Sequence, residues 1–247
     1  MIGLTLAEGI ADLVLCREEA RNAISPALLA ELESALDEVE GANNLKVLVL
    51  RGEGKTFCVG ADLPAVEALP PRETQAFFAR GRALIRRLER LNVLTVAAVN
   101  GLALGGGFEL ALACDVRWAH ARAVFGFPEG ELGLVPGWGG VRLLCRQLPS
   151  SLARELLSRG NRLGASAAHA SGLVSHVFGG KDFEGQVRMA LAAFRDRDAA
   201  VLRSIKQLWL EGGRDGGDRW NAAEAAAFDA LWSRRVARPA KPEEQGS

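Results

Sequence analysis

Apolar residues follow two alternating patterns along the first hundred residues, one typical of strands and one typical of helices. Continuous or near-continuous apolar runs lie at 2–6, 10–16, 46–51 and 93–99. Between them, residues 27–40 and 72–91 place leucines at helical spacing, and Ser25-Pro26 is a helix start signal. Because a continuous apolar run is typical of a strand buried on both faces, the pattern predicts an α/β fold with parallel strands.

The second half of the chain changes character. A glycine cluster at 101–107 precedes a short helical segment at 108–113, and strand signals stop beyond Val177. Helices are predicted at 183–197, 199–211 and 220–235, with a break at 212–217 and a frayed tail from about Pro239. The sequence therefore predicts an α/β core over residues 1–182 and a helical region over 183–247.

Composition narrows the classes of function. The chain has 247 residues, 49% of them hydrophobic, with 30 basic and 30 acidic side chains. This zero net charge disfavours a protein whose main partner is a nucleic acid or an anionic membrane. No apolar run reaches the ~20 residues of a membrane span. The amino terminus has no basic segment before an apolar stretch, so we expect a cytoplasmic protein.

Cysteines and histidines give no metal or redox pattern. The residues are Cys16, Cys58, Cys114, Cys145, His120, His169 and His176. None forms a C-x-x-C or H-E-x-x-H motif, so no metal site is predicted. The cysteines are expected to be free, buried thiols, and the histidines to be structural or surface groups.

The sequence contains parts of two common phosphate-binding motifs, but neither motif is complete. Gly54-Lys55-Thr56 resembles the end of a P-loop, but Val49 stands where the first glycine would be needed. The run Gly105–Gly107 does not continue into a dinucleotide fingerprint, because the third glycine would fall on Phe108 or Leu110.

A more specific arrangement joins three segments, 51–62, 100–109 and 125–139. Glycines at a helix start allow close approach of a backbone or ligand, and the free N–H groups there suit a developing negative oxygen. Glu109 would lie in the first turn of that helix, and Glu129 would come from a separate loop. Two such carboxylates could hold and activate one water molecule.

These segments resemble those of the crotonase superfamily, the enoyl-CoA hydratases and isomerases. The matching motifs are Arg21-Asn22-Ala23, FCVGADL (57–63), AAVNGLALGGGFE (97–109), Cys114-Asp115 and FGFPEGELGLVPGWGG (125–140). The resemblance implies a spiral of ββα units. It also implies a carboxy-terminal helical region that assembles homotrimers, often paired into hexamers.

The resemblance also implies a substrate and roles. An acyl-CoA thioester would place its carbonyl oxygen between the backbone N–H groups of Ala61 and Gly106. Glu109 would hold and deprotonate water, and Glu129 would deliver a proton to the α-carbon. The substrate-binding residues carried over are Val59, Gly60, Asp62, Leu63 and Arg21. No cofactor is implied, since coenzyme A is part of the substrate.

Some residues have competing interpretations. Asp62 is also placed to cap the following turn or helix, Glu131 is expected at the surface, and Trp138 and Phe127 in the pocket wall or core. Departures from the family pattern are Glu18-Glu19 after Arg17, Pro64, Leu94 and an atypical carboxy terminus. These departures bear on the coenzyme A tail and on subunit contacts more than on the chemistry.

Enoyl-CoA hydration is the leading hypothesis, and the pair of glutamates favours it. A double-bond isomerase using Glu129, or another crotonase-type enolate reaction such as decarboxylation, is the alternative within the fold. A remoter alternative is an RNA-binding homologue. A basic segment supports it, although a solvated helix face explains the same residues: Arg80, Arg82, Arg86, Arg87 and Arg90.

Overall fold

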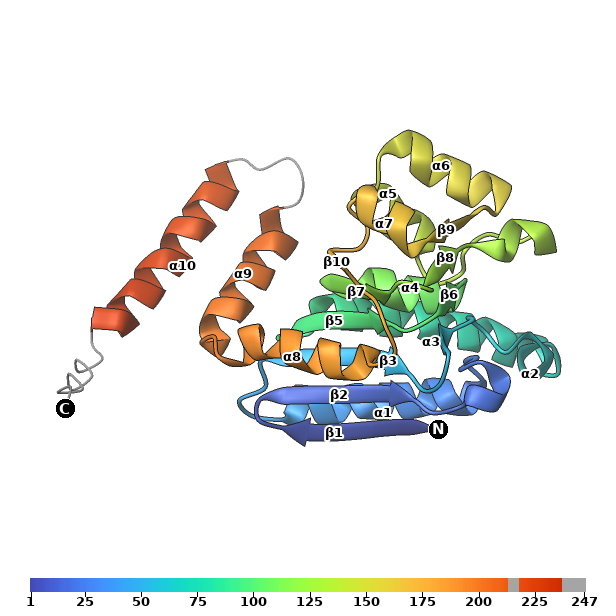
Figure 1. Ribbon diagram of the computed structural model, residues 1–247, viewed down its shortest axis with the longest axis horizontal. Helices are drawn as coiled ribbons and strands as arrows, with labels where there is room; N and C mark the ends of the chain where they lie inside the picture. Colours follow the sequence, from blue (N-terminus) through green and yellow to red (C-terminus); the bar gives the residue numbers. More distant parts are fainter. Residues whose placement is uncertain (213–217, 237–247) are drawn as a thin grey trace.

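A six-stranded sheet forms the centre of the computed structural model, which describes residues 1–212 and 218–236 (Figure 1). Its strands, in spatial order, are β1 (Ile2–Ala7), β2 (Ile10–Leu15), β3 (Val47–Gly52), β5 (Leu94–Val99), β7 (Val116–His120) and β10 (His176–Phe178). β1 and β2 pair antiparallel, and the later neighbours pair parallel. The strands predicted from the four apolar runs are confirmed.

A second sheet of short strands was not foreseen from the sequence. It consists of β4 (Thr56–Cys58), β6 (Leu102–Leu104), β8 (Val124–Gly126) and β9 (Arg162–Gly164). β4, β6 and β8 each follow one long strand, β3, β5 and β7, after a turn. Each pair of strands then leads into a helix, which produces the implied ββα units. Three-residue strands are too short to leave a readable period in the sequence.

Helices cover the large sheet and extend from it. They are α1 (Pro26–Gly41), α2 (Leu63–Glu67), α3 (Pro71–Arg90), α4 (Gly106–Ala113), α5 (Gly140–Gln147), α6 (Ser150–Arg159), α7 (Ala165–Ala170), α8 (Phe183–Arg195), α9 (Ala199–Gly212) and α10 (Asp218–Val236), with 3-10 turns η1 (Glu18–Ala20) and η2 (Pro128–Leu132). The predicted helices are confirmed. The Ser25 hydroxyl caps α1 by accepting from the Leu28 N–H at 3.2 Å, as its start signal indicated.

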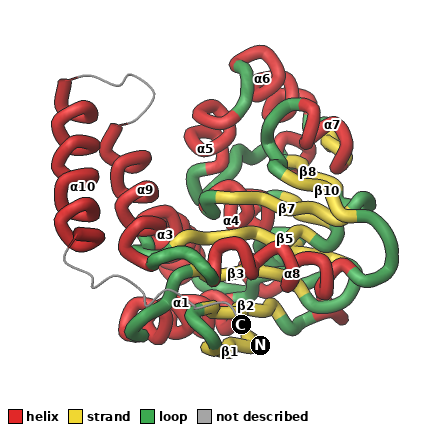
Figure 2. The backbone as a smooth tube through the Cα atoms, turned by 60° about the vertical axis from the view of Figure 1, so that its left-hand side comes forward, coloured by secondary structure: helices red, strands yellow, loops and turns green. Residues whose placement is uncertain are grey.

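Alternating residues of β3 explain its continuous apolar run. Leu48 and Leu50 pack with α1, α3 and α4 in one core cluster, whereas Val47 and Val49 pack with α8 in a second cluster. Figure 2 shows α8 lying across the strands. Both faces of this strand are therefore buried, so no polar position interrupts the run.

The basic face of α3 is partly neutralised by α1. Arg80 pairs with Glu33 at 2.6 Å, and Arg87 pairs with Asp37 at 2.5 Å and with Glu40 at 2.7 Å. These ion pairs neutralise two of the five arginines on which the RNA-binding alternative depends.

The carboxy-terminal helices differ in how they meet the core. The start of α8 coincides with the predicted boundary at residue 182, and α8 packs on the sheet. α9 is anchored by buried Lys206, whose Nζ lies 2.8 Å from Asp115 Oδ2 and 2.9 Å from the Val93 carbonyl oxygen. α10 runs beside α9, away from the sheets (Figure 1). Apart from Gly212, the predicted break and the predicted frayed tail lie outside the described residues.

The burial of the cysteines corrects one prediction. All four are free thiols, but Cys145 on α5 is exposed and Cys16 is only half-buried. Only Cys58 and Cys114 are the buried thiols that the sequence predicted for all four. Cys145 lies on the outer face of the amphipathic helix α5, opposite the buried Leu143 and Leu144. Separately, no helix among the described residues is long and apolar enough to cross a membrane.

Candidate active site

The site forms where α4 begins. Gly105 adopts φ of +51° immediately before the helix, a conformation that favours glycine. A side chain on Gly107 would lie 2.1 Å from the Cys58 carbonyl oxygen, and one on Gly101 would lie 1.8 Å from the Lys55 oxygen. The glycine cluster therefore exists because the β4 segment passes directly against the start of this helix.

Gly60 and Ala61 reach the same place from the loop after β4. Gly60 has φ of +94°, and a Cβ there would lie 2.9 Å from the Gly106 nitrogen. The loop is fixed to Ile24, whose N–H donates to the Gly60 oxygen at 2.8 Å and whose oxygen accepts from the Asp62 N–H at 3.0 Å. Within the described chain, the N–H groups of Ala61 and Gly106 donate to no backbone carbonyl outside regular elements. Both amides therefore stay available to a ligand.

The five residues carried over as substrate-binding lie along this loop and the turn before α1. Val59 and Leu63 are half-buried, and Arg21 is exposed with φ of +53°. Asp62 caps α2 by accepting from the Ala65 N–H at 3.3 Å, which confirms its predicted capping role. Its other oxygen pairs with Arg17 at 2.6 Å, and this pairing lowers the pKa of the carboxyl.

Glu109 is a buried carboxylate, with 1% of its surface exposed. Its Oε1 accepts N–H bonds from Trp138 at 2.8 Å and from Gly140 at 2.7 Å. Desolvation raises the pKa of Glu109 to about 7, and the charge of Glu129 adds to the rise, while the backbone N–H bonds oppose it. A carboxyl with this pKa can exchange a proton near neutral pH.

Glu129 approaches the start of α4 from the other side. It lies in η2, and its Oε1 lies 3.1 Å from the position that a Cβ on Gly105 would take. Its Oε2 is buried with no hydrogen-bond partner among the described residues. Desolvation raises its pKa as well. The structure therefore brings the two predicted glutamates together, while Glu131 is exposed as expected.

The side chains that shape the site include several that sequence reasoning did not single out. Asn22, fully buried, accepts from the Arg17 N–H and donates to the Glu53 and Thr56 oxygens. Asn100 donates to the oxygens of Gly52 and Gly54, both at 2.8 Å. A buried asparagine holding loop carbonyls leaves one signal in sequence, a polar residue at the end of an apolar run. Among the described residues, no group of three or more His, Cys, Asp or Glu is arranged to hold a metal.

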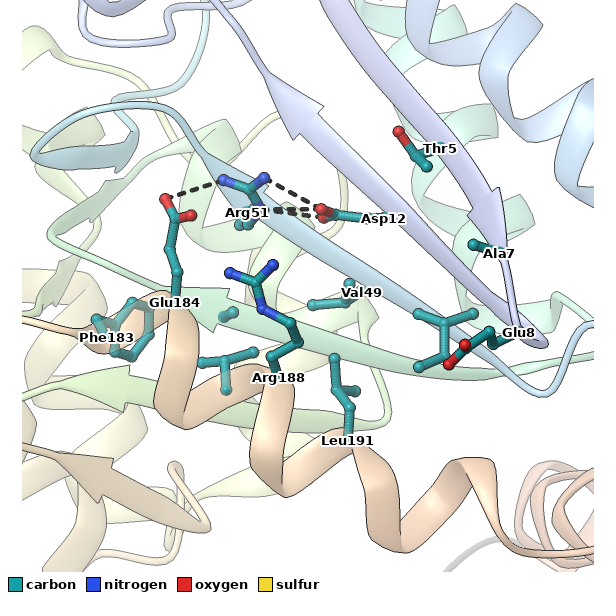
Figure 3. Close-up of a pocket in the computed structure, with 13 residues that line it drawn as sticks. Thr5, Ala7, Glu8, Asp12, Val49, Arg51, Phe183, Glu184, Arg188 and Leu191 are labelled. Atoms are coloured by element: carbon teal, nitrogen blue, oxygen red, sulfur yellow. Dashed lines mark hydrogen bonds and ion pairs between the residues drawn. The ribbon is translucent and has the colours of Figure 1, made fainter.

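A separate cavity of about 280 Å³ lies on the opposite face of the large sheet, between β1–β3 and α8 (Figure 3). Ile10, Val49 and Leu191 contribute apolar walls. Arg51 crosses it, bonded to Asp12 at 3.0 Å and to Glu184 at 3.1 Å. None of the predicted site residues lines this cavity.

Comparison with known proteins identifies related sequences and folds. Crotonyl-CoA hydratase of Syntrophomonas wolfei is 34% identical over 222 residues, covering 90% of this chain and 85% of that protein. The crystal structure of an enoyl-CoA hydratase from Bacillus anthracis superposes with a TM-score of 0.88 at 29% identity, covering 96% of both chains. This superposition confirms the predicted fold class.

A third relative matches over a shorter length. The mitochondrial enoyl-CoA hydratase domain-containing protein 2 of Bos taurus is 42% identical over 171 residues. That match covers 69% of this chain but only 58% of the bovine protein. The profile of the enoyl-CoA hydratase/isomerase family matches residues 5–238. The chain therefore belongs to the enoyl-CoA hydratase/isomerase family.

Proposed function

We propose that this protein is an enoyl-CoA hydratase, which adds water across the 2,3-double bond of an enoyl-CoA thioester or catalyses the reverse dehydration. One observation carries the proposal. Glu109 and Glu129 are desolvated together at the start of α4, both with raised pKa values, and neither forms an ion pair with a cation among the described residues. Such a pair can supply a base and an acid at the same pH.

The addition step assigns one role to each group. Ionised Glu109, with Oε1 held by two amides, takes a proton from water as the water oxygen bonds to the β-carbon. The π electrons move onto the thioester, and the resulting enolate oxygen is stabilised by the N–H groups of Ala61 and Gly106. Protonated Glu129 then donates its proton to the α-carbon. Glu109 ends protonated and Glu129 ionised, and a proton exchange restores the pair.

The loop residues would hold the rest of the substrate. Val59 and Leu63 offer half-buried apolar contacts beside the Gly60 backbone. Arg21 is an exposed cation near this loop, suited to an anionic phosphate of coenzyme A. Asp62 acts indirectly, because its capping and its ion pair with Arg17 fix the loop that carries the Ala61 amide.

Isomerisation of a 3-enoyl-CoA is the alternative reaction. The buried, unpartnered Oε2 of Glu129 favours it, because one carboxylate that moves a proton between carbons suffices for that chemistry. The two reactions therefore differ in their need for Glu109.

The test compares both substrates with matched variants. Hydration is measured as loss of the conjugated thioester absorbance of crotonyl-CoA, and isomerisation as its gain from a 3-enoyl-CoA. We expect Glu109→Gln to lose hydration by roughly 10²–10⁴-fold, whereas Glu131→Gln, an exposed neighbour, retains it. Full hydration by Glu109→Gln would reject the two-glutamate mechanism and favour the isomerase.

We also propose assembly into a homotrimer or hexamer through the carboxy-terminal helices. Trp209, Phe228 and Trp232 expose 69%, 62% and 53% of their surfaces, whereas Trp220 is half-buried. Such large apolar side chains need a cover in water. Light scattering at micromolar concentration should give the mass of a trimer or hexamer, and a stable monomer would contradict the proposal.

A further inference from the structure

Trp138 packs between the helix that starts the site and the helix beside it. Its side chain is 3% exposed. A Cβ on Gly106 would lie 3.0 Å from its Cζ3, and a Cβ on Gly81 would lie 2.2 Å from its Cε2 and Nε1. The ring of Phe77 lies 5.7 Å away, centre to centre. The indole therefore fills the space between α3 and α4 directly beside Gly106.

Gly81 leaves room for the indole because it has no side chain. It lies in the interior of the 20-residue helix α3, where glycine costs about 1 kcal/mol relative to alanine. It has an ordinary helical φ, so no turn requires glycine there. Contact with Trp138 is what excludes a side chain at this position.

The indole position is also tied to the proposed base. The Trp138 backbone N–H donates to Glu109 Oε1, so the ring and the carboxylate belong to one fixed unit. The indole Nε1 is buried without a hydrogen-bond partner among the described residues. Because no internal hydrogen bond accounts for a tryptophan here, its contribution lies in the volume of its ring.

We propose that Trp138 forms the end of the acyl pocket and restricts the substrate to short-chain enoyl-CoA thioesters. This inference rests on the proposed function, which places the thioester oxygen at Gly106 and the double bond between the two glutamates. Carbons beyond the β-carbon must then pass Glu109. The indole and Phe77 occupy the space there, between α3 and α4. A four-carbon acyl group stops before the ring, whereas a ten-carbon group requires the ring to move.

The experiment measures kcat/KM for crotonyl-CoA and for 2-decenoyl-CoA in the wild type and in Trp138→Leu. We expect the wild type to favour crotonyl-CoA by roughly 10²-fold, and the substitution to narrow that ratio by about tenfold or more. Trp118→Leu is the matched control, since Trp118 is a buried tryptophan that packs against Phe178 and Phe194 on the α8 side. It should keep the wild-type ratio.

Binding of butanoyl-CoA and decanoyl-CoA, measured by calorimetry, separates this inference from the proposed reaction. If neither enoyl-CoA is hydrated but butanoyl-CoA binds more tightly, and Trp138→Leu removes that preference, hydration is rejected and the pocket assignment stands. Equal or tighter use of the long chain by the wild type overturns the assignment. So does a ratio that Trp138→Leu leaves unchanged, or failure of butanoyl-CoA to bind.

Discussion

Two groups of charges lie on opposite sides of the large sheet and are treated differently by the fold. At the start of α4, Glu109 and Glu129 are desolvated and their pKa values are raised. Under α8, Arg51 is bonded to Asp12 and Glu184, so each carboxylate there faces a cation (Figure 3). The α8 side has the open cavity of about 280 Å³. The carboxylates that line it are each paired with an arginine, Asp12 and Glu184 with Arg51 and Glu8 with Arg195.

We therefore propose that unpaired buried carboxylates, rather than cavity volume, mark the reactive place in this fold. A cation next to a carboxylate stabilises its ionised form, so a paired carboxylate has little tendency to take up a proton. A buried carboxylate without a cation is poised to bind or release a proton, and the N–H groups beside it remain free to stabilise negative charge. Each side of the sheet can be tested separately.

The largest effect is expected from the glutamates acting together. Glu129→Gln should lower hydration by roughly 10²–10⁴-fold, because the amide cannot deliver the proton to the α-carbon. The double variant with Glu109→Gln should lose far less than the product of the two single losses, because the residues act as a unit. Steady-state kinetics with crotonyl-CoA measures both. Fully multiplicative losses would mean that the carboxylates act independently.

The glutamates also show how far the sequence alone reaches. Glu109 and Glu129 could be predicted because each stands in a motif long enough to be specific. The two hydrogen bonds that hold Glu109 Oε1 could not be predicted, since they come from the backbone N–H groups of Trp138 and Gly140, which every residue type except proline carries. Four strands of the large sheet, β1, β2, β3 and β5, were predicted from their apolar runs, whereas β7 and β10 were not. The three-residue strands of the second sheet, which turn the chain toward the site, are too short to leave a period in the sequence. The need for glycine at position 81 becomes clear only from the structure, in which the Trp138 indole fills the space that a side chain would take.

The next effect is a dependence on pH in which stability and activity move in opposite directions. The pKa of Glu109 rises from its ordinary 4.5 to about 7 in the folded protein. The folded state therefore binds the proton more tightly than the unfolded state does. The resulting contribution of Glu109 to the free energy of unfolding is fully present below about pH 4.5 and is lost as the pH rises through about 7. At about 1.4 kcal/mol per pH unit, the loss is of the order of 3 kcal/mol.

Hydration should rise as the pH increases toward the pKa of Glu109, because Glu109 must be ionised to act as the base, and it should fall once Glu129 loses the proton that it delivers. Chemical denaturation and kcat/KM measured from pH 5 to about 8 would show the two opposing trends. Glu109→Gln is the control, since it removes the ionising group and should flatten this part of the stability profile. A wild-type unfolding free energy that increases through neutral pH would contradict the raised pKa.

A smaller effect is expected at Gly60, which positions the amides without reacting. Gly60→Ala adds a Cβ 2.9 Å from the Gly106 nitrogen and forces alanine to φ of +94°. Displacing the Gly106 amide by a fraction of an ångström should lower kcat by roughly 10²-fold. Gly172→Ala is the matched control, with φ of +77° and open space around it. It should cost stability but keep kcat. Equal losses of kcat in both variants would assign the effect to backbone strain alone.

The smallest effect is expected on the α8 side of the sheet. Arg51→Met removes the cation shared by Asp12 and Glu184, but their side chains are 36% and 58% exposed, so water can solvate both carboxylates. Partly exposed ion pairs of this kind contribute about 1 kcal/mol or less, and salt weakens them further. Denaturant unfolding at low and high salt should therefore show a small loss that shrinks as salt increases, with kcat/KM unchanged. The reason is that this cavity shares no lining residue with the proposed site. A folded Arg51→Met protein that no longer turned over crotonyl-CoA would show that activity also depends on the α8 side of the sheet. The contrast drawn between paired and unpaired carboxylates would then be wrong.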